Sequence, residues 1–120
     1  MIAVIFEVMP SEDGKARYLQ IAAELAPLLA SVDGFISVER FQSLKDPAKI
    51  LSLSFWRDES AVRAWREMHE HRLAQTSGRN GVFSNYRLRV AQVLRDYGLN
   101  DRGQAPADSL RCHDQGASAN

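Results

Sequence analysis

The sequence predicts a single α+β domain built in the order strand, helix, strand, strand, helix, strand. Three observations support this prediction. The chain has 120 residues, which is the size of one domain. Its apolar residues alternate with a period of two in some segments and recur at helical spacing in others. The hydrophobic fraction of 45% and the charged fraction of 25% are typical of a globular protein with an apolar core.

The first strand is expected over residues 2–9, because apolar side chains occupy both of its faces. Only Glu7 interrupts the second face. The first face holds Ile2, Val4, Phe6 and Val8, and the second holds Ala3, Ile5 and Met9. A strand of this kind is expected to be covered on both sides. Residues 10–14 then form a turn.

A helix is expected over residues 15–32. Counted from Tyr18, its apolar residues fall at i+3, i+4, i+7, i+10, i+11 and i+14, which is a single helical stripe. Pro27 lies off this stripe and is expected to kink the helix, because it removes one backbone hydrogen bond. Gly34 is expected to end the segment in a left-handed conformation.

The next two strands are expected over residues 35–43 and 49–57, with a turn at 44–47. In the second of these strands the side chains alternate between two faces. Leu51, Leu53 and Phe55 share one face, and Ile50, Ser52, Ser54 and Trp56 share the other.

The second helix is expected over residues 58–77. Asp58 is its N-cap, because a carboxylate at that position can accept from the first free amides, and Gly78 closes it. The last strand is expected over residues 82–96, where large apolar side chains alternate with arginines.

This order of elements, with right-handed crossovers, is that of a ferredoxin-like βαββαβ fold: a four-stranded antiparallel sheet with two helices on one face. The helices can cover only that face. The first strand still carries Ala3, Ile5 and Met9 on its other side, and we expect Ile50 and Trp56 of the third strand beside them. Because an apolar face of this size is unusual on a monomer, we expect a homodimer through the open sheet face, with a dimeric α/β barrel as its interior.

Composition divides the chain into a folded domain at 1–98 and a polar C-terminal tail at 99–120. The formal net charge of zero argues against nucleic-acid and anionic-membrane partners, which need a basic surface. The single cysteine, Cys112, excludes an internal disulfide. The N-terminus lacks the basic region of a signal peptide and no apolar run is long enough to span a bilayer, so we expect a cytoplasmic protein.

Two stretches carry a resemblance to a known family. Residues 55–71 read FWRDESAVRAWREMHEH, and residues 33–41 read DGFISVERF. With the predicted fold, these stretches resemble the antibiotic biosynthesis monooxygenase (ABM) superfamily of dimeric α+β barrels over residues 1–98, near its haem-degrading branch. Residues 78–79 and 86–90 resemble the bacterial members of that branch. The resemblance implies an ABM domain and an oxidoreductase, specifically a small-molecule monooxygenase.

The chemistry that the resemblance implies is open, because the residue sets of the family's subgroups are incomplete here. Trp65 matches a tryptophan that one subgroup places on the second helix, but Ala61 stands where that subgroup has asparagine. The haem-degrading subgroup has asparagine and histidine where this chain has Glu7 and Gln75. Fold alone does not carry function.

The candidate catalytic residues are Trp65, His69 and Arg87. Trp65 and His69 lie one helical turn apart and so share a face. Each of them can be interpreted as a structural residue of the core or as a functional residue. As functional residues, Trp65 would bound a substrate cavity, and His69 would donate a hydrogen bond to a substrate oxygen or act as a base. Arg87 would stabilise a developing anion.

The candidate substrate-binding residues are polar or aromatic side chains on strands that are otherwise apolar. They are Glu7, Ser52, Ser54, Trp56 and Tyr86. A buried carboxylate needs a partner, so we expect Glu7 to face Arg87 or Arg89, either as a structural ion pair in the dimer or as part of a small-molecule site.

Three functions remain open from the sequence. The first is cofactor-independent oxidation of an aromatic substrate, with no cofactor and no metal bound; no Gly-rich dinucleotide fingerprint is present in the sequence. The second is haem binding or degradation with His69 as the axial ligand. The third is a non-catalytic dimeric ligand-binding module.

Overall fold

The structure is a computed structural model that describes residues 1–75 and 83–110, with side chains placed for 1–69 and 83–110. Its element order confirms the sequence prediction. The elements are β1 (Ile2–Pro10), α1 (Lys15–Ala30), β2 (Phe35–Gln42), β3 (Ile50–Trp56), α2 (Glu59–Gln75) and β4 (Phe83–Gln92).

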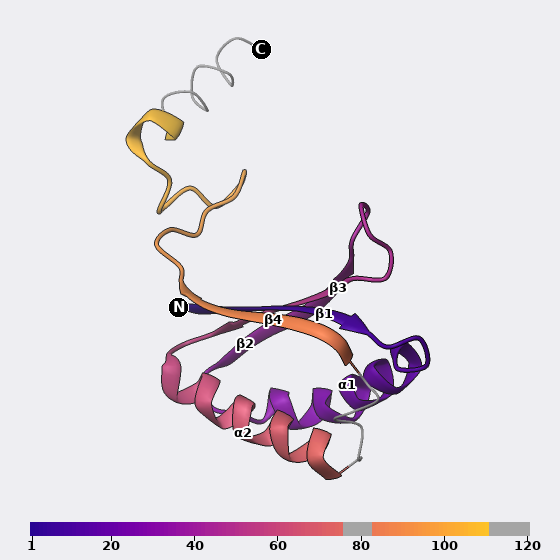
Figure 1. Ribbon diagram of the computed structural model, residues 1–120. Coiled ribbons are helices and arrows are strands. Elements are labelled where there is room, and N and C mark those ends of the chain that lie inside the picture. Colours follow the sequence, from indigo (N-terminus) through magenta and orange to yellow (C-terminus); the bar gives the residue numbers. More distant parts are fainter. Residues whose placement is uncertain (76–82, 111–120) are drawn as a thin grey trace.

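The strands form one antiparallel sheet in the order β2-β3-β1-β4, and both helices lie against the same face of it (Figure 1). In this order β1 and β3 are the two central strands, and β2 and β4 are the edge strands. This is the predicted ferredoxin-like α+β fold.

The core fills the space between the helices and the sheet. Alternate residues of β1 and β3 point into it, and Trp56 is completely buried there. The helical stripe predicted for α1 faces the same space, which confirms the period-3.6 pattern, except that Leu28 is exposed. The core is made of Ile2, Val4, Phe6, Val8, Tyr18, Ile21, Leu25, Leu29, Ile50, Trp56, Ala61, Val62 and Trp65.

One prediction about the sheet is wrong. Ile50 and Trp56 face the helices and not the open side of the sheet, because the register pairs Trp56 with Ile2, whose side chain is in the core. The odd-numbered residues of β3 therefore take the open side beside Ile5 and Met9 of β1. They are Leu51, Leu53 and Phe55, all partly exposed. The open face is still apolar, but with other residues than expected.

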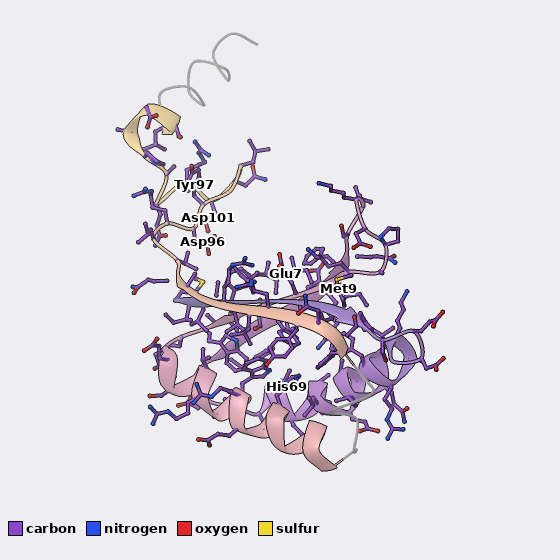
Figure 2. All side chains as sticks on the ribbon, in the orientation of Figure 1. Glu7, Met9, His69, Asp96, Tyr97 and Asp101 are labelled. Atoms are coloured by element: carbon purple, nitrogen blue, oxygen red, sulfur yellow. The ribbon has the colours of Figure 1, made fainter. Side chains whose placement is uncertain are left out.

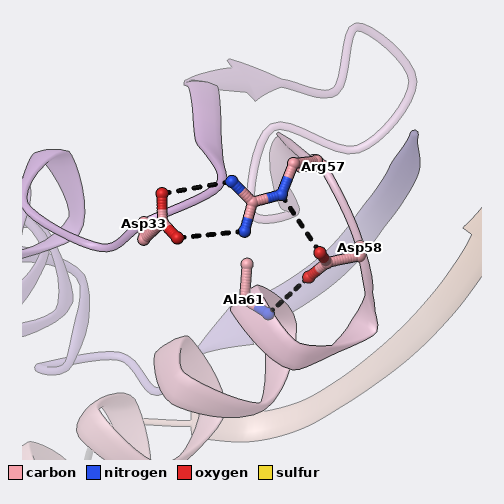
Figure 3. A network of polar contacts seen from close by, with 4 residues as sticks. All are labelled: Asp33, Arg57, Asp58 and Ala61. Carbon is pink, nitrogen blue, oxygen red and sulfur yellow. Dashed lines mark hydrogen bonds and ion pairs between the residues drawn. The ribbon is translucent and has the colours of Figure 1, made fainter.

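A polar network joins the start of α2 to the loop before β2 (Figure 3). Arg57 donates to both carboxylate oxygens of Asp33 at 3.1 Å and to Asp58 at 3.1 Å. Asp58 Oδ1 accepts from the Ala61 amide at 3.0 Å, which confirms the predicted N-cap. That backbone hydrogen bond, and then Arg57, lower the pKa of the Asp58 carboxyl. Gly34 has φ of 94°, the predicted left-handed conformation.

The end of the chain leaves the sheet earlier than expected. β4 ends at Gln92, and residues 93–110 run away from the sheet on the side opposite the helices (Figure 1). They form turns closed by their own hydrogen bonds, such as Asp96 N–H to Gln104 Oε1 at 2.7 Å. The predicted closure of α2 at Gly78 and the side chain of Cys112 lie outside the described residues.

Candidate functional site

A pocket lies between the two helices and the sheet. The empty volume of the pocket is about 360 Å³, but this figure includes space that is open to solvent. The walls themselves lie so close together that the free space between them is little larger than a water molecule. Most of the wall is apolar, from Phe6 and from aliphatic side chains of α1. The polar groups that line it are Tyr18, Arg40, Ser52 and His69. An apolar pocket with a few convergent polar groups is the usual form of a small-molecule site.

Trp65 and His69 form one wall of this pocket, as α2 places them one turn apart on its inner face. The imidazole of His69 stacks on the Trp65 ring, with centroids 5.2 Å apart and an interplanar angle of 21°. The Phe6 ring meets the same imidazole edge-on at 5.6 Å. Two rings from different elements therefore fix the orientation of His69.

Burial lowers the pKa of His69 from 6.5 to about 4, and the positive charge of Arg40 lowers it further in the same direction. Both effects disfavour the imidazolium. His69 is therefore neutral at pH 7, with one ring nitrogen able to donate and the other able to accept. A neutral imidazole in this position can exchange a proton with a bound molecule.

Arg40 was not among the residues selected from the sequence. It lies on β2 directly opposite Ser52 of β3, on the side of the sheet that faces the helices. Its guanidinium carbon sits 5.9 Å from the centre of the Tyr18 ring. In the sequence, Val38, Arg40 and Gln42 alternate along one face of β2, but this alternation does not show which face of the strand packs against the core.

The structure separates the predicted substrate-binding residues. Ser52 lines the pocket. Ser54 and Trp56 are buried elsewhere in the core, where Trp56 Nε1 donates to Ser54 Oγ at 2.8 Å. Tyr86 of β4 points to the helix side and is 60% exposed, with its ring 5.7 Å from that of Phe6.

Glu7 lies on the other side of the sheet from His69 (Figure 2), and the strand register places Arg87 on the same side as Glu7. Arg87 is the register neighbour of Glu7, and Glu7 accepts from Arg89 Nη1 at 3.3 Å, as expected for one of the two arginines. The sequence thus grouped residues that the fold places on two faces: Trp65, His69 and Ser52 share the pocket, whereas Glu7 and Arg87 share the open face.

Residues 1–75 and 83–110 contain no cluster of three or more His, Cys, Asp or Glu side chains that could hold a metal ion. None of the helices in this part of the chain combines the length and the apolar character needed to cross a bilayer.

A protein family and two individual proteins are similar to this chain in sequence. The family described as "Antibiotic biosynthesis monooxygenase" matches residues 1–77. The chain is 48% identical over 101 residues to a protein of Pyricularia oryzae named "Jasmonate monooxygenase ABM", a match that covers 84% of this chain and 47% of that protein. It is 32% identical to "Uncharacterized protein YqjZ" of Bacillus subtilis, over 78% of this chain and 79% of that one. The chain thus spans about half the length of the Pyricularia protein.

Solved structures share the fold. Rv0793 from Mycobacterium tuberculosis superposes with a TM-score of 0.68 at 17% identity, over 81% of this chain and 98% of that one. PA3566 from Pseudomonas aeruginosa gives a TM-score of 0.61 at 18% identity, over 78% of this chain and 93% of that one. At such identities the likeness concerns the fold alone. The family match over residues 1–77, which is more than half of the chain, shows that the chain belongs to the antibiotic biosynthesis monooxygenase (ABM) family.

Proposed function

We propose that the chain is a small-molecule monooxygenase whose reaction takes place in the pocket beside Trp65 and His69. The observation that carries this proposal is a neutral imidazole held in fixed orientation at an apolar pocket, between the Trp65 and Phe6 rings. Membership of the ABM family supports the reaction class.

The proposed reaction needs no bound cofactor when the substrate itself supplies the electrons. An activated CH2 group becomes C=O: the carbon loses two hydrogens and four electrons, O2 takes up the four electrons, one oxygen atom enters the product and the other leaves as water. His69 accepts a proton from the substrate and returns it to the departing oxygen. The apolar walls exclude bulk water from the oxidised carbon.

We propose two kinds of substrate for this reaction. The relative from Pyricularia oryzae is named for jasmonate, so jasmonate is one compound to assay. The aromatic lining of the pocket also suits a phenolic or other aromatic substrate. Hydroxylation of an unactivated C–H bond needs two further electrons, so the assay is run with and without a reduced nicotinamide.

Oxygen uptake with each substrate, followed by mass spectrometry after turnover in 18O2, tests the proposal. We expect incorporation of one labelled oxygen atom per product, and a loss of turnover of roughly 100-fold in His69→Gln, as is typical when a general base is removed. Arg63→Gln, which changes an exposed residue of α2, is the matched control and should keep full activity. Binding of substrate without oxygen uptake under either condition would favour the non-catalytic ligand-binding alternative.

The size of the pocket argues against the alternative function of haem binding. His69 would be the axial ligand, but its ring is already stacked on Trp65 and faces a pocket that is far narrower than a porphyrin. The residues present therefore do not fit haem in this arrangement, and no step is assigned to it. An unchanged hemin spectrum on titration with the protein agrees with this conclusion; a Soret shift lost in His69→Ala would contradict it.

We also propose a homodimer through the open sheet face. The partly exposed Leu51, Leu53 and Phe55 of β3, next to Ile5, form an apolar surface that a second copy can cover. Sedimentation velocity is expected to give a dimer for the wild type and a monomer for Leu53→Lys, with unchanged circular dichroism. A stable monomer for the wild type at micromolar concentration would refute the dimer.

A further inference from the structure

We infer that the pocket binds an amphipathic carboxylate, with Arg40 receiving the carboxylate group and the apolar walls receiving the hydrocarbon body. The inference deepens the proposed function and rests on it for the claim that this ligand is the substrate. Binding of the ligand at Arg40 does not depend on that function.

Arg40 lacks a counter-ion in the part of the chain that the structure describes. The ion pairs there use Arg57 and Arg89 instead. The Nε atom of Arg40 is buried and makes no hydrogen bond, and the contact of its guanidinium is with the face of the Tyr18 ring. A buried donor without a partner is destabilising, and such groups are rare in native proteins. A ligand acceptor inside the pocket supplies this partner.

The chemistry around Arg40 favours a carboxylate. The planar fork of a guanidinium matches two carboxylate oxygens, and such bidentate, charge-assisted hydrogen bonds are strong. Among the side chains that the structure places, the other titratable groups that line the pocket are Tyr18 and His69, and His69 is neutral at pH 7, so this lining carries one positive charge and no acidic side chain. One charge balances a carboxylate but not a dianionic phosphate.

The rest of the pocket suits a slender apolar body. Ile21, Leu25 and Leu29 of α1 face Phe6 of β1 across it. The free space is little larger than a water molecule, so the walls must move apart to admit a ligand, and an alkyl chain or a single flat ring needs less movement than several fused rings. A molecule held by its carboxylate at Arg40 would extend along these walls toward Trp65 and His69, where the proposed oxidation takes place.

Octanoate, octan-1-ol and inorganic phosphate are the probes for a binding test on the full chain by isothermal calorimetry. We expect octanoate to bind the wild type, and its affinity to fall by about 10- to 100-fold in Arg40→Met, the range for loss of a hydrogen bond to a charged group. Octan-1-ol binding should change by less than about threefold in the same variant, because only the apolar walls hold it. Arg63→Gln is the charge-matched control and should bind octanoate as the wild type does. Arg40→Lys keeps the charge but loses the fork, so an intermediate affinity is expected; this variant also serves if Arg40→Met fails to fold.

A second readout is the ionisation of His69, followed by NMR with His69→Gln for assignment. An anion beside Arg40 is expected to raise the pKa of His69, and octan-1-ol is not. Equal affinity for octanoate and octan-1-ol, absence of octanoate binding at millimolar concentration, or tighter binding of phosphate than of octanoate would each overturn the inference. Octanoate binding that depends on Arg40, in a protein without oxygenase activity, would uphold the carboxylate site and refute the proposed function.

Discussion

The buried imidazole of His69 predicts a loss of stability in mild acid. Its pKa is lowered from 6.5 to about 4 by burial and by Arg40, whereas the unfolded chain restores the ordinary value. Between these two values the unfolded state binds a proton that the folded state does not. Stability contributed by the neutral ring is therefore complete above pH 6.5 and is lost as the pH falls toward 4.

The size of the effect follows from the two pKa values. A difference of about 2.5 pKa units corresponds to about 3 kcal/mol, which is reached below pH 4, where both states are protonated. About 2 kcal/mol of this is lost between pH 7 and pH 5. A loss of that size is a substantial part of the 5–15 kcal/mol that is roughly the stability of a native domain.

Urea unfolding at pH 7, 6 and 5 measures this loss, and His69→Gln is the comparison because glutamine does not titrate. We expect the wild type to lose about 2 kcal/mol more than the variant between pH 7 and pH 5. The other titrating groups contribute equally to both proteins and cancel. Parallel pH dependence in the two proteins would mean that His69 titrates near its ordinary value and is solvated, and the account of a buried neutral imidazole would be wrong.

Three further predictions concern the packing that supports the pocket. Gly34→Ala should destabilise the fold by about 1–3 kcal/mol, because φ of 94° is unfavourable for alanine and the new Cβ would lie 2.9 Å from that of Ala61; urea unfolding that matches the wild type would contradict this. Trp56→Phe should cost at least about 1–3 kcal/mol by leaving the buried hydroxyl of Ser54 without its donor, and the double variant with Ser54→Ala should recover part of the loss in a double-mutant cycle; strict additivity would argue against the hydrogen bond. Asp58→Ala should lower the Tm in thermal unfolding through loss of the N-cap, while Asp58→Asn should lower it much less; an equal decrease in both would assign the effect to charge.

The residues that the sequence placed well are those whose role depends on near neighbours in the chain. Trp65 and His69 share a wall because four residues make about one helical turn. Asp58 caps α2 because its carboxylate reaches the amide three residues ahead.

The residues that the sequence could not place depend on the sidedness of a strand. Alternation groups Ile50 with Trp56, but both faces of β3 are apolar enough to be the buried one, so the pattern alone does not decide between them. The same ambiguity applies to Arg40, because the alternation of side chains on β2 is compatible with either face of the strand packing against the helices. Arg87 and Glu7 were grouped with His69 for the same reason, and the fold places them across the sheet.

Local patterns in the sequence are enough to predict the order of the elements, the N-cap of α2 and the helical wall of the pocket, because these follow from backbone geometry over a few residues. The tertiary structure decided the strand register, and with it which side of each strand meets the helices. That decision brings Arg40 and His69, which are 29 positions apart in the chain, into one pocket. The physical reason is that a shift of one residue in register reverses every side chain of a strand, and only packing against the helices selects one of the two alternatives.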